Sequence, residues 1–310
     1  MYDTVNMWLE WSKVGNVNLS TITNKLNNCI EHESKEFNSI TGNLNNYRVG
    51  IYETGISLKG SICKYFNNDN LHTLTRSGME RAIEKMSDEL NIPVGLADIR
   101  QVDLATHFIM NRKVSDYYMF LGSKRYFKRV QATIDTLYYN TKARQLVFYN
   151  KPKEAIAKGV EIPSVYKNEN LLRYEMRHKG RLANQFNLPK VTANTLYDEQ
   201  FYIKLIDIWV KEYFNIEKIN LLSLNNMENI KTPKDAENMI FGLLLNKFGQ
   251  IEIEHIIKEM KANNVYTDPK YYSRLKSNLK RYVNRSEIGK QSELIKELDK
   301  EILNIKQYYR

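Results

Sequence analysis

A tyrosine and a lysine two positions apart are the residues in this sequence best suited to attack a phosphodiester. Tyr149 ends the run Leu146-Val147-Phe148-Tyr149, and Lys151 follows two positions later. The side chains of this run alternate between two faces if it is a β-strand. Pro152 has no N–H for a sheet, so we expect the strand to stop there, with Tyr149 and Lys151 on one face. The competing interpretation is that Tyr149 only packs in a half-buried strand, since the chain has 21 tyrosines.

Two further strand-like runs carry acids on an otherwise apolar background. Residues 97–110 place Asp103 on one side, and residues 171–178 place Glu175 between Arg173 and Arg177. A carboxylate is costly to bury unless it is paired or bound to a metal. The competing interpretation is that these acids lie on a sheet face exposed to solvent, where they need no partner. If the three strands are adjacent, their acids, cations and tyrosine meet in one cleft. Two acids there would suit a hard divalent cation.

The elements that must position these residues divide the chain into two parts. Up to residue 190 we expect strands at 2–9, 47–53, 56–65 and 132–139, helices at 18–30, 74–91 and 115–121, and an irregular stretch at 151–170. Ser77 with Glu80 has the spacing of a capping box for the second helix. The predicted fold is therefore α+β, with an antiparallel-rich sheet in a catalytic domain at 1–190.

Residues 191–310 read as helical and form the second predicted domain, for DNA binding or oligomerisation. Helices are expected at 195–216, 232–249 and 251–261, then from Asp268-Pro269 onward, and at 294–305. The pair within 251–283 fits a helix-turn-helix or a plain αα-hairpin. The terminal helix either docks on the rest of the chain or forms a homodimer.

The charge distribution favours a polyanionic partner. The net charge is +10, and residues 1–190 hold 27 basic and 19 acidic residues against 19 and 17 in 191–310. The excess therefore lies in the half that holds the tyrosine, which favours nucleic acid. One dense cluster is either a phosphate-contact patch or a solvated charged face; it comprises Lys124, Arg125, Lys128 and Arg129.

Several classes of protein are disfavoured by what the sequence lacks. Two cysteines, Cys29 and Cys63, imply neither a disulfide framework nor a zinc site, and there is no His-x-His pair. No apolar run is long enough to span a membrane, and we expect no membrane partner. A reducing cytoplasm is the expected location.

Three segments in this order resemble the gene II/X family of phage and plasmid rolling-circle replication initiators. They are Arg100–Ala105, Leu146–Lys151 followed by Glu154, and Leu172–Lys179. Similar blocks occur in the Rep_trans plasmid initiators. The resemblance covers about residues 45–190.

The resemblance implies an enzyme that nicks one DNA strand at an origin, stores the bond as a 5′-phosphotyrosine and later rejoins it. Tyr149 would be the nucleophile, assisted by Lys151 and Glu154. The implied metal is Mg²⁺ or Mn²⁺. Further roles fall on a set of charged residues: Asp103 and Glu175 as metal ligands, and Arg173, Arg177 and Lys179 against phosphate. The implied partners are origin DNA, double-stranded, locally melted or single-stranded, and a host helicase, in the cytoplasm of a bacterial host.

Two other functions and two other nucleophiles compete with this interpretation. A non-catalytic origin-binding protein or repressor would use the C-terminal helices. A metal nuclease of the Asp…Glu-x-Lys kind is disfavoured, because Arg177 stands where that pattern has lysine. Among tyrosines, Tyr174 falls on the face opposite Glu175 and reads as core. Tyr139, on the preceding strand, is the more serious rival to Tyr149.

Overall fold

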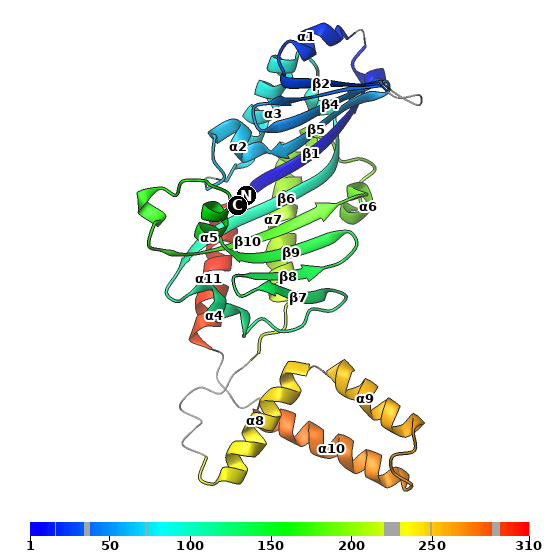
Figure 1. Ribbon diagram of the computed structural model, residues 1–310, viewed down its shortest axis with the longest axis vertical. Coiled ribbons are helices and arrows are strands. Elements are labelled where there is room, and N and C mark those ends of the chain that lie inside the picture. Colours follow the sequence, from blue (N-terminus) through cyan, green and yellow to red (C-terminus); the bar gives the residue numbers. More distant parts are fainter. Residues whose placement is uncertain are drawn as a thin grey trace.

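A single antiparallel sheet of ten strands forms the centre of the protein in this computed structural model (Figure 1). The structure describes residues 1–15, 17–33, 38–71, 73–219, 230–248, 250–286 and 292–309. The strand order is β2-β3-β4-β5-β1-β6-β10-β9-β8-β7. The strands are β1 (Tyr2–Glu10), β2 (Asn27–Glu33), β3 (Asn38–Leu44), β4 (Tyr47–Tyr52), β5 (Gly55–Ser61), β6 (Asp98–Met110), β7 (Lys128–Thr133), β8 (Thr136–Asn140), β9 (Arg144–Asn150) and β10 (Asn170–Lys179). With the helices below, this confirms the predicted α+β class.

Helices connect the strands and fill the C-terminal part of the chain. Those of the first 190 residues are α1 (Leu19–Thr23), α2 (Ile62–Asn67), α3 (Arg76–Leu90), α4 (Val114–Tyr118), α5 (Lys151–Ala157) and α6 (Leu182–Phe186). Those beyond are α7 (Glu199–Phe214), α8 (Pro233–Phe248), α9 (Gln250–Ala262), α10 (Pro269–Ser286) and α11 (Glu293–Tyr308). No helix of the described chain is long and apolar enough to cross a membrane.

The main core lies between one face of the sheet and helix α7. Trp209 of α7 is fully buried, with its ring 4.5 Å from that of Tyr174 on β10 and 6.4 Å from that of Phe108 on β6. Burying such large aromatic side chains removes much apolar surface from water and dominates the stability of this layer. The opposite face of β6 and β10 carries the polar residues, as the alternation of a strand requires.

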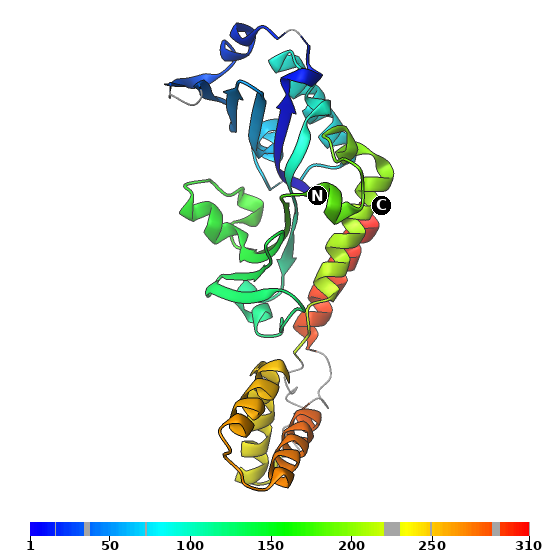
Figure 2. The ribbon, with the colours of Figure 1, turned by 90° about the vertical axis from the view of Figure 1, so that its right-hand side faces the viewer.

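The core continues past residue 190 into the last helix. Helix α11 buries Ile295, Leu298 and Ile302 beside α7, and the Tyr213 hydroxyl donates to Asp299 at 2.6 Å. Figure 2 shows α7 and α11 side by side on the same side of the sheet. The terminal helix therefore docks on the rest of the chain. Helices α8–α10 lie apart from the sheet in both views, and α8 packs against α10.

Several local expectations were wrong, each for an identifiable reason. The predicted helix 18–30 ends at Thr23, and Asn28 has a positive φ of 52° within the following strand. Residues 151–170, expected to be irregular, begin with α5, because the Asn150 side chain caps it by accepting from the Lys153 N–H. Thr75, not Ser77, caps α3.

Strand boundaries also differed from the expectations. The run predicted as one strand at 56–65 turns into α2 at Ile62, capped by Ser61. Strand β7 was not predicted, and it covers Lys128 and Arg129 of the basic cluster. The helix expected at 115–121 is shorter, Val114–Tyr118, with Lys113 in the cap position.

Candidate active site

The three strands that carry the candidate residues are neighbours, in the order β6-β10-β9. Arg173 is paired in register with Tyr149 on one side and with His107 on the other, while Arg177 is paired with Asp103. Because side chains on adjacent strands share a face at paired positions, these groups gather on the face opposite α7. The adjacency on which the sequence argument depended is confirmed.

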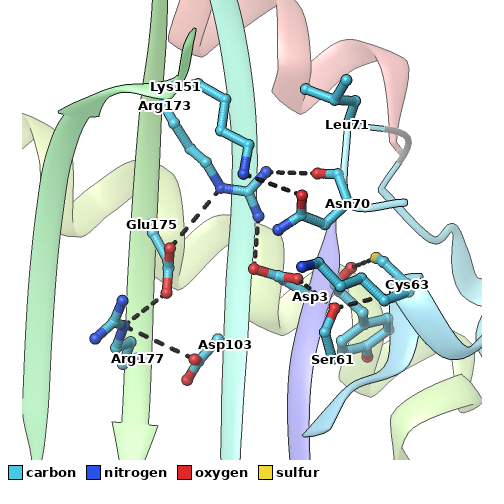
Figure 3. A network of polar contacts seen from close by, with 12 residues as sticks. Asp3, Ser61, Cys63, Asn70, Leu71, Asp103, Lys151, Arg173, Glu175 and Arg177 are labelled. Atoms are coloured by element: carbon cyan, nitrogen blue, oxygen red, sulfur yellow. Dashed lines mark hydrogen bonds and ion pairs between the residues drawn. The ribbon is translucent and has the colours of Figure 1, made fainter. Parts of the chain in front are cut away.

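The phenol and the two acids form a chain of contacts along this face. The Tyr149 hydroxyl donates to Glu175 Oε2 at 3.2 Å. Figure 3 shows the continuation of this chain: Arg177 Nε lies 2.6 Å from Glu175 Oε1 and 3.8 Å from Asp103 Oδ2. Both carboxylates are 3% exposed. Tyr149 is thus joined to Asp103 through Glu175 and Arg177.

Arg173 is the buried cation around which the site is assembled. Its side chain is fully buried; one terminal nitrogen donates to Asp3 at 2.6 Å and the other to the Asn70 carbonyl at 2.8 Å (Figure 3). Its Nε lies 3.8 Å from Glu175. Burial alone would lower the pKa of Arg173, but the surrounding Tyr149, Asp3 and Glu175 raise it, so the guanidinium stays charged.

Lys151 and Glu154 stand together at the first turn of α5. The predicted strand ends at Asn150, so Lys151 is helical, yet its amine still points into the site. It donates to Glu154 at 2.8 Å and to the Asn70 side chain at 3.0 Å. Burial, and then the charge of Arg173, lower the pKa of Lys151. Lys158 also pairs with Glu154.

The environment makes the Tyr149 phenol reluctant to ionise on its own. Burial raises the pKa of Tyr149 well above 10, with Arg173 the largest opposing influence. Burial, followed by the charge of Glu175, raises the pKa of Asp103 to about 8. A site that gathers this much negative charge away from water favours a proton or a cation.

Asp103 and Glu175 suit a divalent cation by chemistry, although a complete ligand cage is not formed. The described residues contain no group of three or more His, Cys, Asp or Glu placed to hold a metal. Asp103 and Glu175 nevertheless offer oxygen ligands from adjacent strands on one face, which suits Mg²⁺ or Mn²⁺. In this structure the positive charge of Arg177 lies between the two carboxylates and offsets their negative charge.

The two rival tyrosines face the core. Tyr174 is fully buried, stacked on Phe148 at 4.6 Å, and its hydroxyl donates to the Trp209 carbonyl. Tyr139 is also fully buried, and its hydroxyl donates to the carbonyls of Leu121 and Gly122. Both hydroxyls therefore lie on the side of the sheet away from Glu175 and Arg173.

The predicted DNA-contact cations do not all reach solvent. Arg173 is fully buried, so its expected role against phosphate is replaced by one inside the site. Lys124 is buried against Glu212 at 2.7 Å. Arg129 donates to the carbonyls of Tyr118 and Leu121. The cations that remain available at the surface, fully or in part, are Arg125, Lys128, Arg177 and Lys179.

Three supporting residues were missed by the sequence analysis. Asp3 binds Arg173 and accepts from the Ser61 hydroxyl at 2.8 Å. A register shift between Tyr2 and Val5 marks a β-bulge there, a device that re-aims side chains. Gln101 donates to Asp103 at 2.9 Å, and Asn70 holds both Lys151 and Arg173. Asp3 and Gln101 had a signal, as polar residues within strand-like runs, whereas Asn70 had none.

Comparison with known proteins assigns most of the chain to a family. The family model for the N-terminal region of a replication-associated protein, the gene II protein of phages, matches residues 1–202. The match covers the strands of the sheet and every residue of the candidate site, and extends into the start of α7. No curated protein matches the chain.

The chain therefore belongs to the family of phage replication-associated proteins defined by that N-terminal region. The gene II-like resemblance drawn from three short segments is thereby confirmed. The remaining 108 residues, 203–310, lie outside the matched range.

Proposed function

We propose that this protein initiates rolling-circle replication by nicking one strand of origin DNA with Tyr149 and later rejoining it. The observation that carries the proposal is the hydrogen bond from the Tyr149 hydroxyl to the buried Glu175 carboxylate. A phenol needs a base or a cation to become a nucleophile near neutral pH. Glu175 is that base, and Arg173, next to Tyr149 across the strand pair, favours the phenolate.

The cleavage step follows from this geometry. The Tyr149 oxygen attacks the scissile phosphorus as its proton passes to Glu175. The bond between phosphorus and the 3′ oxygen breaks, and that oxygen leaves as a 3′-hydroxyl after taking up a proton. The 5′ end remains linked to Tyr149 as a phosphodiester.

Rejoining is the reverse reaction. A 3′-hydroxyl attacks the phosphotyrosine and releases its proton to solvent, the tyrosine oxygen leaves and regains its proton from Glu175, and the strand is sealed. No ATP is needed, because the energy of the broken bond is kept in the tyrosine ester.

The charged residues around Tyr149 have supporting roles in this proposal. Lys151, held by Glu154 and Asn70, adds positive charge close to where the phosphate would lie. A divalent cation held by Asp103 and Glu175 would polarise the phosphate and stabilise the charge that develops on it. Arg177 and Lys179, partly exposed, face the flanking phosphates.

The alternative of a non-catalytic DNA-binding protein has one observation in its favour. Helix α10 carries six Lys and Arg residues and no acid over Pro269–Ser286. Such a helix suits a DNA backbone or groove. We propose that it contributes to binding the origin duplex in addition to the chemistry at Tyr149, and that a host helicase opens the strands afterwards.

The test is a covalent trap on a supercoiled plasmid that carries the cognate origin. With Mg²⁺ or Mn²⁺, the wild-type protein should nick the plasmid and remain attached through one peptide containing Tyr149. Tyr149→Phe should bind without nicking. Attachment through Tyr139, or nicking by Tyr149→Phe, would overturn the assignment; binding with no nick by any variant would favour the non-catalytic function.

A further inference from the structure

A pocket on the open face of the sheet lies beside the candidate active site and has no role in the chemistry above. It has a volume of about 300 Å³ and is lined by Asn6, Met7, Trp8, Tyr52, Ser57, Lys59 and Arg100. This is the lower end of the range for small-ligand sites. Hydrogen bonds connect it to the active site, since Asn6 donates to Gln101 and Gln101 donates to Asp103.

Two aromatic rings form one wall of this pocket. The rings of Trp8 and Tyr52 lie 5.8 Å apart and are tilted by 43°. Each ring covers a glycine: a Cβ on Gly50 would lie 2.9 Å from the Tyr52 ring, and one on Gly55 would lie 2.8 Å from Trp8. The absence of side chains at these positions lets both rings lie along the sheet. Flat, partly exposed aromatic rings are a platform on which nucleic-acid bases stack.

Two exposed cations, Lys59 and Arg100, lie beside the rings. Among the residues that the structure describes, neither has an ion-pair partner. Arg100 occupies a β-bulge, because Asn6 pairs with Gln101 while Met7 pairs with Ile99. The bulge turns Arg100 toward the pocket. The pocket thus combines stacking surface with positive charge, as an unpaired nucleotide requires.

A line of polar residues runs from the pocket across five strands. We call it the transverse row; it consists of the register partners Arg48, Lys59, Asn6, Gln101 and Lys179, on β4, β5, β1, β6 and β10. Neighbouring strands are about 4.8 Å apart, so the row spans roughly 19 Å. Arg48 and Lys59 are directly opposed like charges, an unfavourable pair unless an anion lies over them.

We propose that the open face binds an unpaired stretch of DNA, whose backbone follows the transverse row and one of whose bases stacks in the Trp8–Tyr52 pocket. The inference rests on the proposed function, because it makes this stretch the strand that continues to Tyr149. Tyr149 shares its register level with Arg173 and His107, and His107 lies six residues along β6 from Gln101, about 20 Å, which a few nucleotides of extended strand span. A base held in the pocket therefore fixes which phosphate reaches the nucleophile.

The test measures binding of the full chain to a fluorescein-labelled dT15 single strand by anisotropy and by tryptophan quenching. Trp8→Leu and Tyr52→Leu should each weaken binding by roughly 5- to 150-fold, the range for loss of one base–aromatic stack. Trp8→Phe keeps a ring, so it should retain most of the affinity while losing most of the quenching. The matched controls are Tyr308→Leu and Lys300→Gln, exposed positions on α11 behind the sheet, which should bind as wild type.

Several outcomes separate this inference from its rivals. The bases of the dT15·dA15 duplex are already stacked, so this duplex should bind the pocket variants with the same affinity as it binds the wild type. Free thymidine monophosphate at the same nucleotide concentration should not quench. Wild-type affinity of Trp8→Leu and Tyr52→Leu for dT15, equal losses on the duplex, or quenching that persists in Trp8→Phe would each overturn the pocket.

The same assay distinguishes a failed pocket from a failed nicking mechanism. Tyr149→Phe should bind dT15 normally, because its hydroxyl is outside the pocket. If the pocket variants lose dT15 but no protein–DNA adduct ever forms, the proposed nicking is wrong and the pocket stands. If adducts form and a 4-thiothymidine crosslink maps away from Trp8 and Tyr52, the pocket is wrong.

Discussion

Tyr149 on β9 donates its hydroxyl hydrogen to Glu175 on β10, 3.2 Å away, across a strand pair whose register places Arg173 directly beside the phenol. One contact thus joins the proposed nucleophile to a proton acceptor, and the neighbouring residue supplies a fixed positive charge. The pairing of β9 with β10 sets this geometry, so it does not depend on a loop.

Removing the hydroxyl tests the nucleophile. Tyr149→Phe should abolish the protein–DNA adduct while leaving DNA affinity near wild type, because the ring keeps its packing; losing the hydrogen bond to Glu175 should lower stability by no more than about 1–3 kcal/mol. Tyr139→Phe is the matched comparison: it should keep the adduct but lose two buried hydrogen bonds, which lowers stability by about 1–3 kcal/mol. Adduct formation is read on denaturing gels and stability from urea midpoints.

Replacing the acids separates a residue that would only hold the metal from one that would also be the base. Glu175→Gln should slow nicking by about 10²- to 10⁴-fold even at saturating Mg²⁺, since the proton acceptor is gone, and should also raise the Mg²⁺ concentration that is needed. Asp103→Asn should chiefly raise the Mg²⁺ or Mn²⁺ concentration needed for half-maximal nicking. The two titrations are compared on the same plasmid. Full activity of the wild type in excess chelator would contradict the metal assignment.

The buried ion pair of Asp3 with Arg173 should dominate the stability of the site. Asp3→Asn leaves the fully buried Arg173 without its closest carboxylate, which should cost about 3–5 kcal/mol. The control is Asp135→Asn, which breaks the pair with the largely exposed Lys153 and should cost less than about 1 kcal/mol. If both variants lose the same free energy of unfolding, the Asp3–Arg173 pair contributes no more to stability than a surface ion pair.

DNA affinity should depend on salt through the exposed members of the basic cluster. Arg125→Gln and Lys128→Gln should each reduce the slope of log affinity against log salt by about 0.7–0.9, one phosphate contact. Lys300→Gln on α11 should leave the slope unchanged. An unchanged slope in both cluster variants would place the phosphate contacts elsewhere.

The buried His178 should make the free energy of unfolding fall in mild acid. Burial lowers the pKa of His178 to about 4, so the unfolded chain takes up a proton on this side chain near pH 6.5 and the folded protein does not. Its contribution is therefore present above pH 6.5 and lost as the pH falls toward 4, by about 3 kcal/mol. Urea midpoints between pH 4.5 and 7 should fall less steeply for His178→Leu than for wild type. Parallel pH profiles would contradict this.

The charged residues of the candidate site could be predicted from the sequence, but most of the residues that hold them in place could not. The alternation of residues 171–178 correctly puts Glu175 on one face and Tyr174 on the other, and the family resemblance selects Tyr149. Asn70 could not be found this way, because a loop residue gains its role only from the fold that brings it to Lys151 and Arg173. The same is true of Arg100, whose direction is set by a bulge.

Some fold errors came from signals that have two interpretations. Pro152 marks the end of a strand, but it equally suits the first turn of a helix, and the cap at Asn150 decides for α5. A helix at 195–216 was expected from the spacing of its apolar residues, but periodicity does not say what covers the apolar face. The sheet does, so the core includes residues beyond 190.

The packing of α11 against α7 also fixes the order in which the protein can be completed during its synthesis. Helices α8–α10 emerge from the ribosome before Ile295, Leu298 and Ile302, because α11 follows them in the chain. Domains generally form as they emerge, beginning at the N-terminus. Here the sheet, although it is made first, keeps part of its apolar surface uncovered until the last helix arrives. The sheet, which is synthesised first, therefore completes the burial of its apolar surface only after α11 has been synthesised.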